Sequence, residues 1–271
     1  MELPASPVSA WPARRRRAEQ LRERHPFAGE VLTLYLALLD VQEPAFEAAL
    51  ASPPEPSELP AFLARELVPE VVAATVAAGP AGLGEQAVAR FHSADLEDLV
   101  CGWLQGKEQS AVDRYLARAA AAPVLEALGP TALAAACAWP QLDEDRVGAA
   151  RCPHCGGPPQ VSFVPVSGEA LVSAPRRLVC ARCAGSWTLI RMVCAGCGET
   201  TGARLPVYAD GERFPHLRIE GCETCHRYLV AVDARRDAAA VPEVDELAAL
   251  PLDLYAKERG LRKVTPNLMG M

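Results

Sequence analysis

The sequence predicts an α+β multidomain protein, with an all-α helical N-terminal domain, two tandem four-cysteine modules and a short helical tail. Helical periodicity runs through the first 150 residues, and at Cys152 it gives way to Gly, Pro, Cys and short alternating runs. In that second region four CxxC pairs recur at a fixed interval. We therefore expect a helical bundle at 1–150, metal modules at 151–192 and 193–234, and a tail at 235–271.

The first helices are predicted from apolar runs and proline positions. Residues 31–39 are apolar nearly all round, as in a buried helix, and this helix is expected to stop before Pro44. Residues 51–60 contain four prolines and predict a loop. A second helix is expected over 61–78, with a bend at Pro69.

Capping residues predict the later helices of this domain. Ser93 is expected to cap a third helix, and Ser110 begins a capping box for a fourth. A last helix is expected over 131–138, and no stretch of the domain alternates as a strand does. Cys101 and Cys137 each lie alone on these helices, so we interpret them as core residues.

The second region predicts short strands between tight turns. Residues 160–164 and 187–193 alternate between apolar and polar side chains, and the β-prone run at 228–232 is predicted as a strand in the same way. Gly156 and Gly198 each follow a CxxC pair, where a turn with positive φ is expected. Each module is thus predicted to be zinc-ribbon-like, with the order knuckle, strand, turn, strand, knuckle and strand. Here a knuckle is the tight turn that contains one CxxC pair.

The tail predicts two short amphipathic helices and an extended end. The helices are expected at 244–250 and 252–259, with Gly260 as a C-cap. The last residues, from 264 onward, are predicted to be extended.

The CxxC pairs predict two metal sites. Cys152 precedes Cys194 by 42 positions, and Cys180 precedes Cys222 by the same interval, so the region divides into two equal repeats. Cysteines three apart can place both sulfurs on one ion, and four thiolates complete a tetrahedral site. We favour one site within each repeat. The predicted metal ligands are Cys152, Cys155, Cys180 and Cys183 in the first, and Cys194, Cys197, Cys222 and Cys225 in the second.

A different pairing of the CxxC motifs is the alternative. Cys180 and Cys183 could join Cys194 and Cys197 across only ten residues, which would leave the outer pairs to meet over a long loop. In either arrangement four thiolates suit zinc or a single iron. Such a site has no open position for a substrate, so we expect a structural or electron-carrying metal.

Two histidines and one tryptophan lie close to the CxxC pairs in the sequence. His154 and His226 adjoin the knuckles as alternative ligands, but surface positions in tight turns are the favoured interpretation. Trp187 is expected to pack over a metal site rather than recognise a ligand. The sequence contains no Ser-His-Asp set, phosphate loop or HExxH helix, so we predict no catalytic residues and no enzyme activity.

Charge weakens a nucleic-acid interpretation. The formal net charge is −7, with 12 basic and 21 acidic side chains in residues 1–150 and 9 basic and 7 acidic ones in residues 151–234. Two divalent ions with eight thiolates would turn the only basic region slightly negative. A ribbon that binds nucleic acid or acts in transcription therefore stays an alternative, as does a rubredoxin-like redox protein.

The sequence predicts a cytoplasmic protein with no membrane span. No run of 18 apolar residues occurs, and the arginines at 14–17 are followed by charged residues rather than the apolar segment of an export signal. Clustered cysteines in a reducing compartment bind metals more often than they form disulfides. The sequence leaves the oligomeric state open, with a homo-oligomer among the options.

The order of these motifs resembles the FdhE family, the formate dehydrogenase accessory proteins. The resemblance lies in a helical N-terminal domain, Cys-Pro-His-Cys-Gly-Gly at 152–157, Cys-Ala-Arg-Cys-Ala-Gly-Ser-Trp at 180–187 and Cys-Ala-Gly-Cys at 194–197. Residues 17–22 with His25-Pro26-Phe27, and Pro266-Asn267-Leu268 at the end, also resemble the family.

The resemblance implies a function that spacing does not. It implies a cytoplasmic maturation chaperone that is needed for active respiratory formate dehydrogenase and binds its catalytic subunit before export. It also implies that both modules are rubredoxin-like and associated with iron, while zinc fits the same donors. All eight cysteines that the family's motifs require are present.

Overall fold

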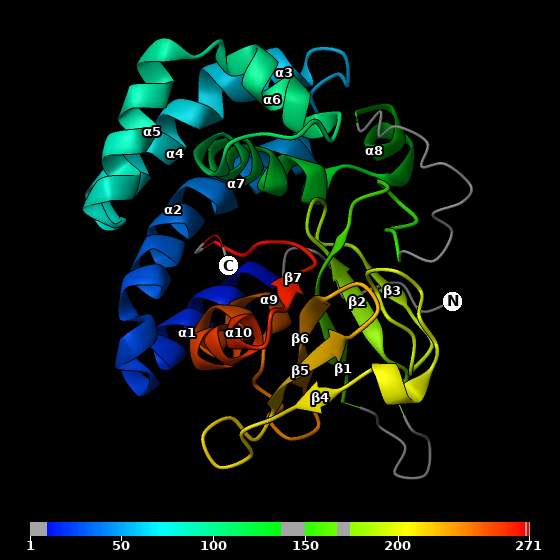
Figure 1. The fold of residues 1–271 in the computed structure, drawn as a ribbon. Helices are drawn as coiled ribbons and strands as arrows, with labels where there is room; N and C mark the ends of the chain where they lie inside the picture. The colour runs from blue at the N-terminus through cyan, green and yellow to red at the C-terminus, as the bar shows by residue number, and fades with distance from the viewer. Residues whose placement is uncertain (1–9, 137–149, 167–173, 269, 271) are drawn as a thin grey trace. The chain divides into compact units, whose positions relative to one another are not determined.

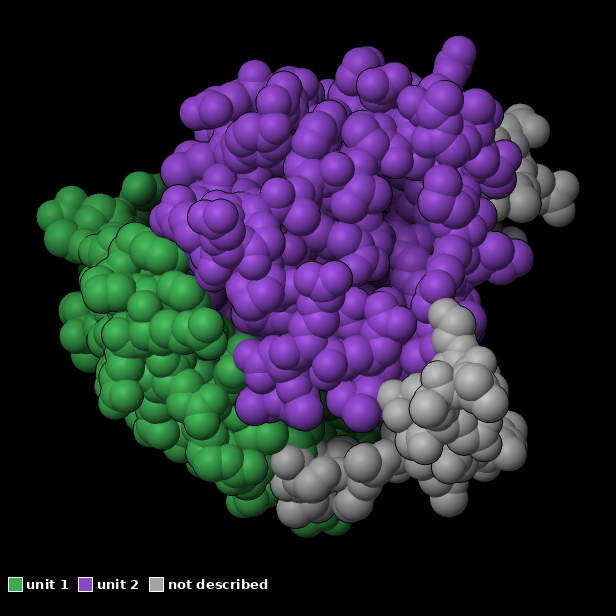
Figure 2. Space-filling model, turned by 90° about the horizontal axis from the view of Figure 1, so that it is seen from below, with its two compact units in different colours: residues 1–140, 154–156 green, residues 141–153, 157–271 purple. Residues whose placement is uncertain are grey.

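The computed structural model describes residues 10–136, 150–166, 174–268 and 270 (Figure 1). The chain divides into two compact units, a helical unit of residues 1–140 with 154–156, and a sheet unit of residues 141–153 with 157–271 (Figure 2). Among the described residues, no helix combines the length and apolar character that crossing a bilayer requires.

The helical unit follows the predicted all-α character. Its α-helices are α1 (Ala10–Arg24), α2 (Gly29–Ala51), α3 (Leu59–Phe62), α4 (Val68–Ala78), α5 (Ala81–Ser93), α6 (Leu96–Leu104), α7 (Ala111–Ala127) and α8 (Pro130–Ala136). Helix α2 packs against α1, α4 and α7. Trp11, Leu39 and Phe46 form one buried cluster, and the rings of Trp11 and Phe46 are 5.4 Å apart. Burial of these apolar faces stabilises the unit.

The prediction that the first long helix stops before Pro44 was wrong. Helix α2 continues to Ala51 with Pro44 inside it. A proline removes one helical hydrogen bond, but the buried neighbours of α2 hold the helix together on both sides of Pro44. Gln42 Nε2 also donates to the Ala119 carbonyl of α7, at 2.8 Å. Tertiary packing of α2 thus outweighs the local cost of Pro44 in the helix.

The predicted helix at 61–78 forms in three parts. These are α3, a π-helical turn at Leu63–Leu67 and α4. Pro69 is the second residue of α4, just after the π-helical turn.

Two caps and one missed helix distinguish the later part of the unit. Ser110 Oγ accepts a hydrogen bond from the Asp113 N–H at 3.1 Å, which confirms the predicted cap of α7. Ser93 was predicted wrongly, because it is the last residue of α5, and Asp95 caps α6 by accepting from the Asp98 N–H. Helix α5 was not predicted, since glycines early in it weaken the helical pattern.

Of the two single cysteines of the helical region, Cys101 differs from the expectation. Cys101 is half-buried rather than fully buried, and its sulfur accepts a hydrogen bond from Gln105 Nε2 at 3.0 Å. Helix α8 covers most of the predicted helix at 131–138, but Cys137 and residue 138 lie outside the described residues.

The sheet unit contains one mixed sheet that both repeats share. Its strands are β1 (Pro159–Val164), β2 (Arg177–Cys180), β3 (Ser186–Thr188), β4 (Val207–Tyr208), β5 (Leu217–Cys222), β6 (Arg227–Asp233) and β7 (Arg262–Lys263). Their order is β3-β2-β1-β6-β5-β4, with β7 paired to β6. The parallel pair of β1 and β6 joins the first repeat to the second (Figure 1). The boundary between 192 and 193 as a domain limit stays a prediction.

The strand predictions were partly right. Strands β1 and β6 confirm the strands predicted at 160–164 and 228–232, and both are buried along nearly their whole length. The stretch 187–193 is a strand only up to Thr188, after which the chain turns and Met192 adopts a φ of +59°. Strand β5 was missed although Leu217 and Ile219 alternate with polar residues.

The tail covers part of the sheet. After α9 (Pro242–Asp245) and a 3₁₀ turn at Glu246–Ala249, helix α10 (Leu250–Glu258) packs against β5 and β7. Gly260 ends this helical segment with a φ of +74°, as predicted for a C-cap. A shared apolar core lies between the helices and the sheet. It includes Val161, Phe214, Ile219, Val230, Val232, Leu252 and Ala256.

Candidate metal centres

The four CxxC pairs adopt one backbone conformation. The residue after the second cysteine of each pair has a left-handed φ, which is +69° at Gly156, +53° at Ala184, +79° at Gly198 and +54° at His226. The two glycines adopt it without steric cost, as predicted, whereas Ala184 and His226 carry a Cβ there. The knuckle geometry therefore recurs even where the sequence lacks glycine.

Backbone hydrogen bonds close the knuckles. The N–H groups of Cys152, Cys180 and Cys194 each donate at 2.9 Å to the carbonyl five residues later. In the fourth knuckle Cys222 pairs with Arg227 across the β5–β6 ladder, again five residues apart. The second and fourth CxxC pairs are thus the turns of the β2–β3 and β5–β6 hairpins, which fixes their sulfurs at the ends of strands.

The first repeat brings four buried thiols together. The ligand atoms of Cys152, Cys155, Cys180 and Cys183 all lie within 4.8 Å of one another. The sulfurs of Cys152 and Cys183 are 3.7 Å apart. The Arg182 N–H also points at the sulfur of Cys180, at 3.3 Å. This is the grouping that sequential pairing of the motifs predicts.

The second repeat forms an equivalent group that is less deeply buried. The ligand atoms of Cys194, Cys197, Cys222 and Cys225 again lie within 4.8 Å of one another. The Cys194 and Cys225 sulfurs are 3.7 Å apart, and those of Cys197 and Cys222 are 3.8 Å apart. The Gly196 N–H points at the sulfur of Cys194, at 3.3 Å.

Both groups can hold a metal ion. A regular tetrahedron with metal–sulfur bonds of about 2.3 Å has sulfur–sulfur edges of about 3.8 Å, close to the distances in both groups. The cysteines of both groups are free thiols rather than disulfides. The donor set therefore fits the predicted zinc or iron equally well, since both ions accept four sulfurs in this geometry.

Electrostatics in the second group also favour a cation. Burial raises the pKa of the Cys194 thiol to about 11 and raises the pKa of Cys225 as well. Burial acts to raise the pKa of Cys222 too, but N–H groups of Cys225 and Thr224 outweigh it and leave that pKa lowered. Four thiolates at this separation repel one another, so a bound cation is what would keep all four deprotonated.

The two sites differ in what packs beside the knuckles. A Cβ on Gly157 would lie 2.8 Å from the Cys180 sulfur and 2.8 Å from Arg182 Cδ. The position 42 residues later is Glu199, whose carboxylate accepts from the Thr224 hydroxyl at 2.6 Å and from the Thr201 N–H at 2.8 Å. Thr224 is itself 42 residues after Arg182. One repeat thus pairs a glycine with a large side chain, and the other pairs a glutamate with a small one.

The histidines and the tryptophan near the CxxC pairs occupy surface and packing positions. His154 and His226 are exposed in their turns, and no histidine lies in either four-cysteine group. Trp187 is partly buried against Leu178, Ala195 and Leu229. It therefore packs beside the third knuckle, as expected of a packing residue.

Sequence reasoning missed a buried histidine and its carboxylates. Ligand atoms of His216, Asp237 and Asp245 lie within 4.8 Å of one another. His216 Nε2 is 2.8 Å from one oxygen of Asp245, and the other oxygen accepts the Val241 N–H at 2.7 Å. Both oxygens of Asp245 thus serve local structure, where they fix the start of α9.

Comparison with known proteins places the chain among others with this architecture. The family model described as FdhE, C-terminal domain, matches residues 190–269. A protein named FdhE homolog from Aquifex aeolicus is 36% identical over 119 residues, which are 44% of this chain and 41% of that protein. An FdhE homolog from Rhizobium meliloti is 30% identical over 199 residues, which are 70% of this chain and 61% of that protein. The alignments thus span less than two thirds of these curated relatives.

The structural comparison extends over the full chain. The crystal structure of the FdhE protein from Pseudomonas aeruginosa matches with a TM-score of 0.67 and 25% identity, and the match covers 98% of this chain and 96% of that one. The fold and its cysteine groups define a protein with a helical N-terminal region and a sheet that carries two four-cysteine centres. The chain is similar to FdhE proteins in fold along nearly its whole length and matches the FdhE C-terminal family model over residues 190–269.

Proposed function

We propose that this protein is a maturation factor for respiratory formate dehydrogenase, which binds the catalytic subunit of that enzyme before export. The observation that carries the proposal is the match to an FdhE structure along 98% of the chain, which includes the helical unit as well as the sheet. The proposal makes the protein a cytoplasmic accessory factor without catalytic residues of its own.

Each four-cysteine group is proposed to hold one metal ion. The ligands would be the eight cysteines of the two groups: Cys152, Cys155, Cys180, Cys183, Cys194, Cys197, Cys222 and Cys225. With four protein ligands, an ion has no free coordination position, so it supplies structural stability or carries a single electron. Iron follows from the family resemblance, and zinc fits the same sulfurs.

The function is tested in a strain that lacks this protein. We expect its respiratory formate dehydrogenase activity to fall to background and to return when the chain is supplied from a plasmid. A pull-down with the tagged chain should recover the unexported catalytic subunit. Full formate dehydrogenase activity in the deletion strain would refute the proposed function.

The metal proposal is tested on anaerobically purified protein. We expect two metal ions per chain in the native protein and one in the Cys180→Ser variant, because that change removes one ligand of the first group only. Iron in four thiolates absorbs visible light when oxidised, whereas zinc is colourless, so an optical spectrum distinguishes the ions. Two tightly held ions in the Cys180→Ser variant would contradict the assignment of Cys180.

A further inference from the structure

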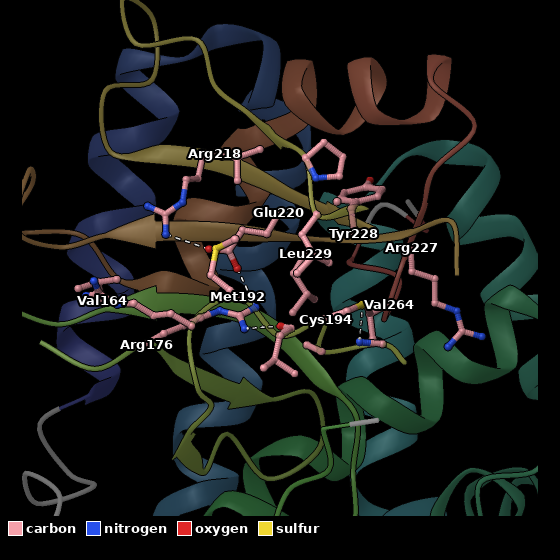
Figure 3. A pocket seen from close by; sticks show the side chains of 18 of the residues that line it. Val164, Arg176, Met192, Cys194, Arg218, Glu220, Arg227, Tyr228, Leu229 and Val264 are labelled. Atoms are coloured by element: carbon pink, nitrogen blue, oxygen red, sulfur yellow. Dashed lines mark hydrogen bonds and ion pairs between the residues drawn. The ribbon is translucent and has the colours of Figure 1, made fainter. Parts of the chain in front are cut away.

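A pocket of about 220 Å³ opens in the sheet unit beside the second four-cysteine group (Figure 3). Its walls are the segment that leads into the third knuckle, the loop before β4, and strands β5 and β6. Cys194 and Gly196 form the wall on the side of the cysteines. Neither the predicted metal chemistry nor the sheet accounts for this pocket.

Arginine dominates the pocket. One carboxylate, Glu220, lines it together with five arginines: Arg176, Arg191, Arg218, Arg227 and Arg235. Glu220 lies 2.7 Å from the Arg176 guanidinium and 2.9 Å from that of Arg218. The lining therefore carries more positive than negative side chains. We call this site the arginine pocket.

Two of these arginines have no carboxylate partner among the described residues. Arg235 is paired with Asp233 at 2.7 Å, but Arg191 donates only to the Ala174 carbonyl, at 2.6 Å. The guanidinium of Arg227 has no hydrogen bond or ion pair with the residues that the structure describes, and the side chain is exposed. A guanidinium with free N–H groups can bind a carboxylate through two hydrogen bonds.

A filled metal site would offset part of this charge. Four thiolates around a divalent ion carry −2, and Cys194 lines the pocket. The stem of Arg227 passes the same wall, since its Cδ is 3.4 Å from the position of a Cβ on Gly196. In Figure 3, Arg218 lies on the side of the pocket away from Cys194 and Arg227. Arg227 is thus placed to balance the thiolates, while Arg191 keeps an uncompensated charge.

The rim of the pocket is apolar and exposed. Met192 is 59% exposed and Val207 is 57% exposed, and both line the pocket. Ile190, next to Arg191 in the chain, is 76% exposed. Met192 also holds a left-handed φ of +59°, a strained conformation for a side chain with a Cβ, and such strain concentrates at functional positions. Large exposed apolar side chains around a polar pocket are typical of a protein-binding surface.

The combination of charges and rim selects one kind of ligand. A small oxyanion would make no use of the apolar side chains of Met192 and Val207. A nucleic acid would bring several phosphates close to Glu220, which is already held by two arginines. An extended peptide with an acidic side chain next to an apolar one would satisfy both Arg191 and the rim.

We propose that the arginine pocket binds an extended acidic and apolar segment of the client protein, with a carboxylate on Arg191 and an apolar side chain against Met192 and Val207. The identity of the client as the formate dehydrogenase catalytic subunit rests on the proposed function. The chemistry of the segment rests on the pocket alone.

Peptide binding tests the pocket independently of the client. The probe is a fluorescein-labelled peptide of alternating leucine and glutamate, with a lysine-for-glutamate peptide as its counterpart, and the readout is fluorescence anisotropy with the full-length metal-loaded chain. We expect the Arg191→Gln variant to bind the acidic peptide at least about tenfold more weakly, since a charged hydrogen bond is lost. Arg236→Gln is the matched control, because Arg236 is exposed, donates to the Pro215 carbonyl and lies outside the pocket lining.

Four outcomes of the peptide-binding experiment would overturn the proposal. These are equal affinity of the Arg191→Gln variant and the native chain, equal binding of the lysine peptide, saturable binding of inorganic phosphate alone, and tighter binding of single-stranded RNA that depends on Arg191. The metal content of each variant is measured alongside, so that loss of the second metal site is not mistaken for loss of peptide contacts.

Site-specific cross-linking connects the pocket to the client. A photoreactive amino acid replaces Met192 in one full-length variant and Leu254 in another, because Leu254 is 47% exposed on α10 and outside the pocket lining. With the purified catalytic subunit, we expect cross-links from position 192 to an acidic segment and none from position 254. Cross-links from 254 alone would overturn the pocket and leave the proposed function intact. Acidic-peptide binding without any cross-link to the subunit would keep the pocket and count against the proposed function.

Discussion

Single residues decide how closely the backbone approaches each cysteine group. The first repeat places Gly157 against the Cys180 sulfur and the buried side chain of Arg182. The second repeat places Glu199 at the corresponding position and lets its carboxylate reach Thr224 on the fourth knuckle. Both repeats keep a similar grouping of sulfurs. In the first repeat the small residue is Gly157 and its neighbour Arg182 is large, whereas in the second the larger residue is Glu199 and its neighbour Thr224 is small. A substitution at either position should therefore affect only its own site.

Gly157→Ala is expected to weaken the first metal site. The new Cβ would lie 2.8 Å from the Cys180 sulfur and from Arg182 Cδ, so the knuckle or the buried arginine must move. Overpacking of this kind costs about 1–3 kcal/mol. Measured by competition with a chelator, one of the two metals should leave faster than in the native chain. Gly211→Ala is the control, since nothing lies within 4 Å of its Cβ, and identical metal release from both variants would contradict the prediction.

Glu199→Gln is expected to loosen the second metal site. Hydrogen bonds from the Thr224 hydroxyl and the Thr201 N–H lower the pKa of the Glu199 carboxyl to about 2. The charged carboxylate therefore joins the third and fourth knuckles at neutral pH, and its contribution is lost as the pH falls from the ordinary glutamate range toward 2. At pH 7 we expect about tenfold faster loss of one metal, as for other residues that support ligands.

The control for Glu199 is an exposed carboxylate without such bonds. Glu212 is exposed in the loop before β5, so Glu212→Gln removes the same charge and supports no knuckle. Equal metal release from the two glutamine variants would show that Glu199 acts only through long-range charge.

At the scale of elements, a buried charge cluster attaches the tail to the sheet. Lys263 of β7 lies 2.7 Å from Glu246 in the 3₁₀ turn and 3.0 Å from Asp253 of α10. Gln160 of β1 also donates to Glu246, and Tyr228 of β6 donates to Asp253. Three of these groups are charged and almost inaccessible to water, with one lysine facing two carboxylates. Such a cluster costs desolvation but leaves only one arrangement of these elements well paired.

Glu246→Gln is expected to change how stability depends on pH. Burial raises the pKa of Glu246 and of Asp253, because one lysine cannot compensate both carboxylates. A raised carboxyl pKa means that the folded state binds protons more tightly than the unfolded state, so this contribution to stability is greatest at low pH and declines as pH rises through the raised pKa. The variant lacks that titration. The stability lost in the variant should thus shrink as pH rises, as measured by urea unfolding from pH 4 to 8.

The outcome can be separated from general charge effects. Glu258→Gln changes an exposed carboxylate at the end of α10 and should leave the pH dependence of the native chain unchanged. A constant stability difference between the native chain and Glu246→Gln over the whole pH range would contradict the assigned titration.

At the scale of the whole molecule, the two units depend on metal differently. The helical unit has its own apolar clusters and capped helices, whereas the sheet unit has hairpins whose turns are the cysteine knuckles. In proteins with structural metal sites, metal binding contributes directly to the free energy of folding. Unfolding of the chain is therefore not expected to be a single two-state transition.

Metal removal is expected to disturb the sheet unit and spare the helical unit. After treatment with a chelator under reducing conditions, hydrogen exchange should accelerate in β2 and β5, which end at Cys180 and Cys222. Helices α2 and α7 should keep their protection, because α2, α4 and α7 pack against one another. Equal loss of protection in α2, α7 and β5 would show that the two units unfold together.

Several features were predictable because they are local. A capping box at Ser110 and the C-cap at Gly260 follow from the conformations that a few neighbouring residues can adopt. The grouping of the cysteines follows from equal loop lengths. Pro44 and Ser93 were misjudged because burial of α2 outweighed the cost of a proline, and because Asp95 competed with Ser93 for the cap.

The sequence by itself determined the division into a helical part and a cysteine part, the eight cysteines and their two groups, since these depend on composition and spacing. Tertiary structure was needed to show that both repeats share one sheet through the parallel pairing of β1 and β6, and that Arg191, Glu220 and Arg227 meet in one pocket. Those arrangements depend on contacts between residues far apart in the chain. Spacing within a motif constrains a few neighbouring dihedral angles, whereas the side of a sheet on which distant arginines gather depends on the packing of the whole unit.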